Sequence, residues 1–184
     1  MPEPEIDQFK KNMDLLKENY PAQYDLVSKF QKAETKSELI SQENRKPNIR
    51  VHLSETQSIL IHDASNPGKE ADAFLSLVPE QSTGVLLIFG LGLGYSLIEL
   101  AKKREKVQWI VVFELNPEFF IYALRQTDLS EVLTDKRLIL CLGLPNNIGS
   151  VLFPAQKALM LESIHTLMRC WPVIRRKRRP WPSF

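Results

Sequence analysis

Residues 84–100, GVLLIFGLGLGYSLIEL, join an apolar run to a helix-forming segment through three glycines at alternate positions, Gly90, Gly92 and Gly94. The continuous apolar residues 85–89 are typical of a strand that is buried on both faces of a sheet. Glycine is unfavourable inside a strand or a helix, so three glycines in five positions indicate a tight turn or a close backbone approach to a ligand. This stretch therefore predicts a strand, a glycine turn and a helix.

The residues that follow repeat the same alternation of strand and helix. Residues 107–115 form a second apolar run that ends at Glu114, and residues 137–142 form a third. Between them, Asn116 is a good N-cap residue and Pro117 suits the first helical turn. Strands and helices that alternate with short connections predict a parallel sheet with right-handed crossovers. The predicted fold class is α/β, with a partial Rossmann-like, methyltransferase-like parallel sheet.

A helical segment and a β-hairpin are predicted before this sheet. Apolar residues at helical spacing predict a helix over residues 6–20, and Pro21 plausibly opens a second one. Alternation over residues 48–63 predicts the hairpin, and a helix follows Asn66 and stops at Pro79. The predicted domains are the N-terminal helices with a polar linker (1–47), the hairpin plus helix (48–80), the partial Rossmann-like domain (81–172) and a basic disordered tail (173–184).

After the third strand, the pattern predicts a helix that begins at Pro154. Leu161, Ile164, Met168 and Trp171 recur at intervals of three and four residues, as on one face of a helix. No fourth strand is expected, so the sheet is predicted to be incomplete and the chain to be a truncated form of something longer.

The composition is that of a globular protein without a membrane span. The chain of 184 residues has 24 Lys+Arg and 22 Asp+Glu, and removing the basic run 175–179 leaves 19 against 22, which does not suggest a nucleic-acid-binding surface. No apolar run approaches the roughly 18–20 residues that cross a bilayer, and the acidic N-terminus is not a secretory signal. Cys141 and Cys170 are interpreted as reduced packing residues of a cytoplasmic protein, and no metal site is predicted.

The glycine turn is the candidate ligand site. Glu114 follows Gly94 by 20 residues at the end of the second strand, where an acidic side chain can hold ribose hydroxyls. The spacing G-x-G-x-G resembles the first motif of S-adenosylmethionine-dependent methyltransferases, although Ile88 stands where those enzymes usually carry an acidic residue. The expected cofactor is a nucleotide or S-adenosylmethionine, and the alternative is a corner without a ligand. The predicted contacts are Gly90, Gly92, Gly94, Glu114 and Tyr95, whose ring would stack on a base or cover the turn.

Few other residues suggest chemistry. His52, His62 and His165 are scattered, and His62, beside Asp63, is expected to have a hydrogen-bonded structural role. Glu70 is a functional candidate, or a residue of the helix surface or cap. No catalytic residue is assigned.

Two pieces of the sequence together resemble a known family. HDASNPGKEADAF, at residues 62–74, followed by FGLGLGYSLIELAKK and VFELNPEFFIYAL, resembles the N-terminal region of bacterial motility accessory factors. The shared Asn/Asp-Pro-x-x-Glu-Ala segment is Asn66, Pro67, Glu70 and Ala71 here. The resemblance implies a link to flagellin glycosylation with nonulosonic acids, with a transferase domain further along the chain.

Three functions are compatible with the sequence, one implied by the resemblance and two alternatives. It implies that this region is not catalytic alone and that its partner is flagellin or a downstream transferase domain. The alternatives are a divergent S-adenosylmethionine-dependent methyltransferase and a structural interaction module.

Overall fold

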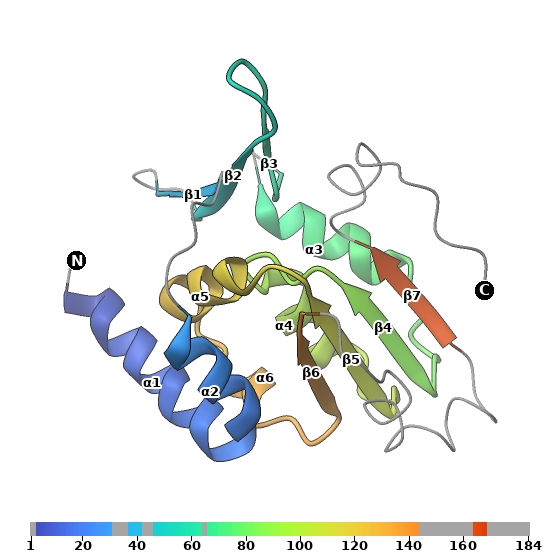
Figure 1. The fold of residues 1–184 in the computed structure, drawn as a ribbon. Coiled ribbons are helices and arrows are strands. Elements are labelled where there is room, and N and C mark those ends of the chain that lie inside the picture. The colour runs from blue at the N-terminus through green and yellow to red at the C-terminus, as the bar shows by residue number, and fades with distance from the viewer. Residues whose placement is uncertain (1–2, 31–36, 42–45, 64–65, 144–163, 169–184) are drawn as a thin grey trace, which may run out of the picture.

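The computed structural model describes residues 3–30, 37–41, 46–63, 66–143 and 164–168 (Figure 1). Its elements are two N-terminal helices, a small antiparallel sheet, and a parallel sheet with its helices. In chain order they are α1 (Glu3–Asn19), α2 (Pro21–Lys29), β1 (Ser37–Ile40), β2 (Asn48–His52), β3 (Ser58–Leu60), α3 (Pro67–Ser76), β4 (Val85–Phe89), α4 (Tyr95–Lys103), β5 (Trp109–Glu114), α5 (Pro117–Gln126), α6 (Ser130–Leu133), β6 (Leu138–Leu142) and β7 (Ile164–Met168).

The parallel sheet has the strand order β6-β5-β4-β7 (Figure 1). The chain moves outward from β4 to β5 to β6 and then returns to the other side of β4 for β7, as in half of a doubly wound sheet. All three pairs are parallel, which requires the long crossover connections that the sequence pattern predicts. The predicted α/β fold with a Rossmann-like parallel sheet is confirmed.

The strand β7 corrects the prediction for the C-terminal region. The sequence predicts a helix through Ile164 and Met168 and no fourth strand, whereas these residues bound a strand that pairs with β4, with Val85 opposite Ile164 and Phe89 opposite Met168. Apolar residues at only three of these five positions fit a short strand as well as a helical face, so periodicity could not separate the two. Pro154, Leu161 and Trp171 lie outside the described residues.

The small sheet pairs β1, β2 and β3 in antiparallel order. The predicted hairpin is confirmed as β2 and β3. The predicted linker is wrong in part, because β1 lies within it and pairs with β2, with Leu39 opposite Ile49. Four residues are too few to show an alternating pattern, and the pairing with β2 determines the strand.

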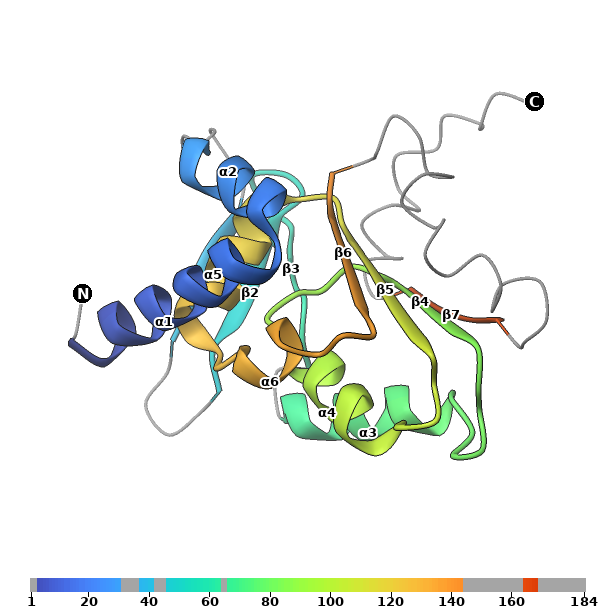
Figure 2. The ribbon, with the colours of Figure 1, turned by 90° about the horizontal axis from the view of Figure 1, so that it is seen from below.

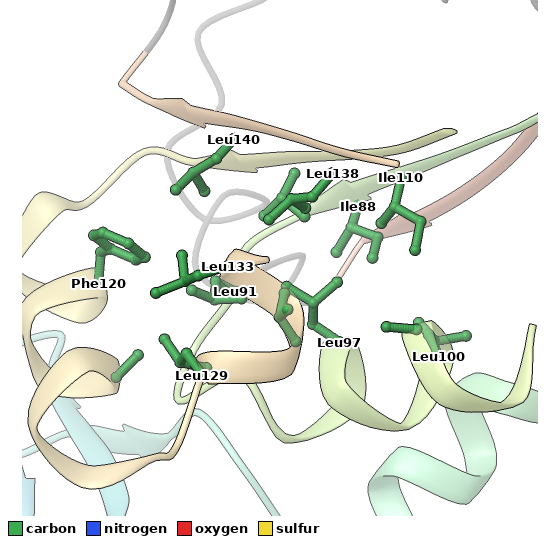
Figure 3. Close-up of a cluster of buried hydrophobic side chains, with 14 of the residues drawn as sticks. Ile88, Leu91, Leu97, Leu100, Ile110, Phe120, Leu129, Leu133, Leu138 and Leu140 are labelled. Atoms are coloured by element: carbon green, nitrogen blue, oxygen red, sulfur yellow. The ribbon is translucent and has the colours of Figure 1, made fainter. Parts of the chain in front are cut away.

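Helices cover one face of the parallel sheet. Figure 2 shows α3, α4 and α6 on the same side of the strands, and Figure 3 shows the side chains between them. Ile88, Ile110 and Leu140 project from the strands toward Leu97, Leu100 and Leu133 of α4 and α6 in this cluster. Alternate strand residues project to the opposite face, where Val85, Val111, Phe113 and Cys141 form a second buried cluster.

The predicted packing role of Cys141 is confirmed, because its thiol is free and buried in the second cluster. Burial raises the pKa of this thiol to about 11, so the reactive thiolate is scarce at neutral pH. Cys170 lies outside the described residues. No helix in the described part of the chain has the length and apolar character needed to cross a membrane.

A buried arginine, Arg104, and a half-buried one, Arg137, bind the C-terminal ends of α3 and α4. Arg104 donates to the carbonyl oxygens of Leu75 (2.7 Å) and Val78 (2.6 Å), just at and after the end of α3. Arg137 donates to the carbonyl oxygens of Ala101 (2.7 Å) and Arg104 (2.9 Å) at the end of α4. Helix ends expose carbonyl groups that need donors, and cations are favourable there. These contacts fix both helices against the sheet.

An exposed aspartate between α5 and α6 connects them to α1. Asp128 accepts hydrogen bonds from the Ser130 hydroxyl and backbone N–H, the latter at 3.0 Å, and from Lys11 Nζ at 3.0 Å. The Ser130 hydroxyl, and then Lys11, hold the pKa of Asp128 down at about 2. A carboxyl pKa that is lower in the folded state stabilises the fold above the unfolded value of about 4 and stops doing so as the pH falls through about 2.

We therefore expect the stability difference between the native chain and Asp128→Asn to shrink as the pH falls from about 4 to about 2. The measurement is the free energy of unfolding in urea over this pH range. The difference should be small even at neutral pH, because the side chain is largely exposed and solvent screens it. Asp25→Asn on the exposed side of α2 is the matched control. A difference that stays constant down to pH 2 would contradict the assigned contacts.

Candidate functional site

The glycine turn lies at the carboxyl end of β4, beside the point where the strand order reverses between β4 and β7. Ligands of doubly wound sheets bind at this edge. All three glycines have positive φ angles: 88° for Gly90, 59° for Gly92 and 84° for Gly94. Side chains other than glycine rarely adopt this conformation, so the alternate glycines are needed to fold the turn itself. Gly94 is the N-cap residue of α4.

Four of the five backbone N–H groups of residues 90–94 donate to acceptors inside the protein. Gly90 donates to the Phe113 carbonyl at 2.8 Å, and Gly94 donates to the Leu91 carbonyl at 3.1 Å. Leu91 donates to Glu114 Oε2 at 2.8 Å. Leu93 donates to His62 Nε2 at 2.8 Å. Two side chains therefore occupy the amides that a bound phosphate or ribose would use.

Glu114 is placed at the turn as the sequence predicts, but it faces the backbone. Its side chain is buried, and Oε1 accepts the backbone N–H of Asn116 at 2.9 Å while Oε2 accepts that of Leu91. Burial raises the pKa of Glu114, and hydrogen bonds from surrounding backbone N–H groups oppose that rise. The carboxyl group thus joins the end of β5 to the glycine turn and to the start of α5.

His62 binds the glycine turn from the other side. It lies just after β3, is fully buried, and contacts Glu70 Oε2 through Nδ1 at 3.1 Å. Because Nε2 accepts the Leu93 N–H, the ring hydrogen lies on Nδ1 and is donated to Glu70. Asn48 holds the backbone of His62 from both sides, accepting its N–H and donating to its carbonyl at 3.0 Å each. The structural role predicted for His62 is confirmed.

The His62–Glu70 contact explains the unusual segment that precedes the turn. Glu70 lies in the first turn of α3, and Oε2 also accepts the backbone N–H of Asp63 at 3.2 Å. This carboxylate therefore orients the imidazole that binds the glycine turn. His62 and Glu70 lie eight residues apart in the sequence, but the group that His62 binds, the Leu93 N–H 31 residues further on, is visible only in the fold.

Tyr95 covers the turn. Its ring lies 5.0 Å from the His62 ring, and Lys46 Nζ lies 5.0 Å from the Tyr95 ring centroid. The phenol donates to the Pro47 carbonyl at 3.1 Å, and burial raises its pKa to about 12. The ring is thus packed between protein groups on the side of β2.

The structure brings all five predicted contact residues together around one turn. Gly90, Gly92 and Gly94 form it, Glu114 binds its amides, and Tyr95 follows it at the start of α4. Within the described ranges, no cluster of three or more His, Cys, Asp or Glu side chains is arranged to hold a metal ion. Among the described residues, the site is held together by hydrogen bonds between buried groups.

Comparisons with known proteins give a family match. Residues 52–137, which run from β2 through the glycine turn to the start of β6, match the model of the glycosyltransferase Maf N-terminal domain. The resemblance to motility accessory factors is confirmed over these residues. No curated protein matches the sequence.

A solved structure shows a similar fold, and a second one aligns more weakly. The Maf glycosyltransferase from Magnetospirillum magneticum AMB-1 aligns with a TM-score of 0.62 and 14% identity, over 89% of this chain and 32% of that one. The chain therefore spans about a third of the length of that glycosyltransferase, and the likeness is one of fold. TYW2 from M. jannaschii, solved in complex with AdoMet, aligns with a TM-score of 0.32 and 15% identity over 62% of this chain and 47% of that one.

Proposed function

We propose that this chain, whose residues 52–137 match the Maf N-terminal domain, is a non-catalytic domain that positions a Maf-type transferase region or its acceptor protein in the cytoplasm. The observation that carries this proposal is the occupied glycine turn. Four of the five N–H groups of residues 90–94, those of Gly90, Leu91, Leu93 and Gly94, donate to acceptors inside the protein. A ligand at the turn would have to displace two buried side chains, Glu114 and His62.

The proposed partners follow from the family. The resemblance to motility accessory factors implies flagellin as the acceptor protein and a nonulosonic acid as the transferred sugar. A domain that only positions partners needs a rigid frame, and the hydrogen bonds that join β3, α3, β5 and α4 through the glycine turn provide one.

The test separates positioning from catalysis. The purified chain is assayed for sugar transfer to flagellin from a cytidine-activated nonulosonic acid, and its binding to flagellin and to a separately produced Maf transferase region is measured by calorimetry. We expect binding to at least one partner and no transfer. Transfer by the chain alone would contradict the non-catalytic role, and a folded chain that binds neither partner would contradict the positioning role.

A second candidate is a ligand-binding turn. We propose Gly90, Gly92, Gly94, Tyr95 and Glu114 as its contact set, with a nucleotide or S-adenosylmethionine as the ligand. The observation that favours it is the position of Glu114, at the carboxyl end of β5 beside the turn and next to the strand-order reversal.

The second candidate is tested by calorimetric titration with S-adenosylmethionine, S-adenosylhomocysteine and cytidine nucleotides. Binding that is lost in Glu114→Gln, with thermal unfolding unchanged, would support it. No heat from any ligand, or equal binding by Glu114→Gln, would contradict it and leave the glycines with a purely structural role.

A further inference from the structure

The buried imidazole of His62 uses both of its ring nitrogens. Nε2 accepts the backbone N–H of Leu93 at 2.8 Å, and Nδ1 contacts Glu70 Oε2 at 3.1 Å. A backbone N–H group can only donate, so Nε2 carries no hydrogen and the imidazole is neutral in this arrangement. A second proton would have to bind Nε2, where it would face the Leu93 N–H. The bond between His62 and the glycine turn therefore exists only while His62 is unprotonated.

Protonation strengthens one of the two imidazole contacts and abolishes the other. With a positive imidazolium, the contact to the Glu70 carboxylate becomes a charge-assisted hydrogen bond. Asn48 also holds the backbone of His62, through two hydrogen bonds of 3.0 Å each. His62 is thus fixed on the side of β2 and α3, and the contact that gives way is the one to Leu93.

The glycine turn is able to change shape at this residue. Leu93 lies between Gly92 and Gly94, and a glycine backbone adopts other conformations at little steric cost. Leu93 is itself fully buried, so its N–H group is left without an acceptor when the His62 bond breaks. A buried N–H group without a partner is unfavourable, and the turn is expected to open until this group reaches water.

Other titratable side chains contact His62 or its partners. Among the described residues these are Glu70 on α3, Asp63 just after His62, Tyr95 on α4, Lys46 ahead of β2 and Glu114 at the end of β5. Glu70 is in direct contact with the ring, and its negative charge favours the protonated imidazole. Burial raises the pKa of Tyr95 to about 12, so its phenol stays uncharged near neutral pH.

We propose that His62 is a pH-sensitive switch, which holds the glycine turn closed when it is neutral and releases the Leu93 N–H when it is protonated. The closed turn accepts only the neutral imidazole, so a falling pH favours the released turn. Histidine ordinarily changes its charge between about pH 5 and 8, and the release is expected in this range. This inference goes beyond the proposed positioning role and does not depend on it.

The test is amide hydrogen exchange of the ¹⁵N-labelled chain, followed by NMR between about pH 8 and 5. The ring ¹⁵N signals of His62 report its protonation in the same samples. Below the midpoint of that titration, we expect the protection of the Leu93 amide, corrected for the intrinsic exchange rate, to fall about tenfold per pH unit, because one proton is bound on release. The amide of Val111, in the buried strand β5, is the reference and should keep its protection.

Two variants separate the switch from a general effect of acid. Glu70→Gln removes the negative charge beside the ring, so the midpoint should move to lower pH. His62→Gln keeps a side-chain acceptor that does not titrate, so the protection of Leu93 should no longer depend on pH. His52→Gln, at the exposed end of β2, is the matched control and should behave like the native chain.

Several results would overturn the proposal. One is a folded chain in which His62 becomes protonated while the Leu93 amide keeps its protection. Another is a loss of protection at Leu93 and Val111 together, which would show that acid unfolds the whole chain. A midpoint that does not fall in Glu70→Gln, or an unchanged pH dependence in His62→Gln, would equally exclude His62 as the switch.

Discussion

Replacing Gly92 with alanine is expected to destabilise the fold by about 3 kcal/mol or more. Two costs combine at this residue. Its φ angle of 59° is strained for any residue with a Cβ atom, and that Cβ atom would lie 2.7 Å from His62 Nε2 and 2.9 Å from Cε1. The imidazole cannot retreat without releasing the Leu93 N–H and Glu70, which hold it from both ends. Chemical denaturation of the purified variant measures the change.

Gly143 provides a matched control for the backbone term. Its φ angle is 77°, and a Cβ atom there would meet no atom of the described residues within 4 Å. Gly143→Ala should therefore show the conformational cost alone, about 1 kcal/mol. The cost of Gly92→Ala should also fall when His62 is already alanine, since the contact is then absent. Equal losses for Gly92→Ala and Gly143→Ala would contradict the close approach of His62 to the turn.

Asn12→Ala is expected to cost about 3 kcal/mol or more, because it leaves three buried backbone groups without their partner at ~1–3 kcal/mol each. Asn12 lies fully buried on α1. Its Nδ2 donates to the carbonyl oxygens of Leu124 and Thr127 at 2.8 Å each, and its Oδ1 accepts the Leu129 N–H at 3.1 Å. One side chain thus binds the end of α5 and the start of α6. Urea denaturation with circular dichroism measures the loss.

Asn19→Ala on the same helix is the matched control. Asn19 is exposed and donates only to the Leu15 carbonyl four residues earlier, so its loss should stay within about 0.5 kcal/mol. Asn12→Asp keeps the size of the side chain but places an oxygen against two carbonyls, and it should destabilise at least as much as Asn12→Ala. Similar stabilities for Asn12→Ala and Asn19→Ala would show that α1 is not anchored through this residue.

The sequence alone predicted the elements whose signals are local. The apolar run of β4, the glycines after it and the N-cap Asn116, which accepts the Glu118 N–H at 3.0 Å, each depend on residues within a few positions of one another. The alternation of these elements was enough to predict the parallel sheet. Where the local signal was ambiguous, the prediction failed: β7 was expected as a helix, and β1 as part of a linker.

The predicted site residues were brought together, but their partners could not be foreseen. The sequence places Glu114 at the edge of the sheet where ligands bind, because the carboxyl ends of all parallel strands lie at that edge. Whether its oxygens face a ligand or the protein depends on the path of the turn, which brings the Leu91 N–H within 2.8 Å. The same holds for His62, whose neighbour in sequence is Asp63 and whose partners in space are Glu70 and Leu93.

The sequence by itself thus determined most of the strands, helices and turns, with β1 and β7 as exceptions, because backbone preference and apolar periodicity act over a few residues. Only the tertiary structure decided what the glycine turn binds. Its N–H groups are directional donors that take whichever acceptors packing brings within about 3 Å, and packing joined β3, β5 and α3 around the turn.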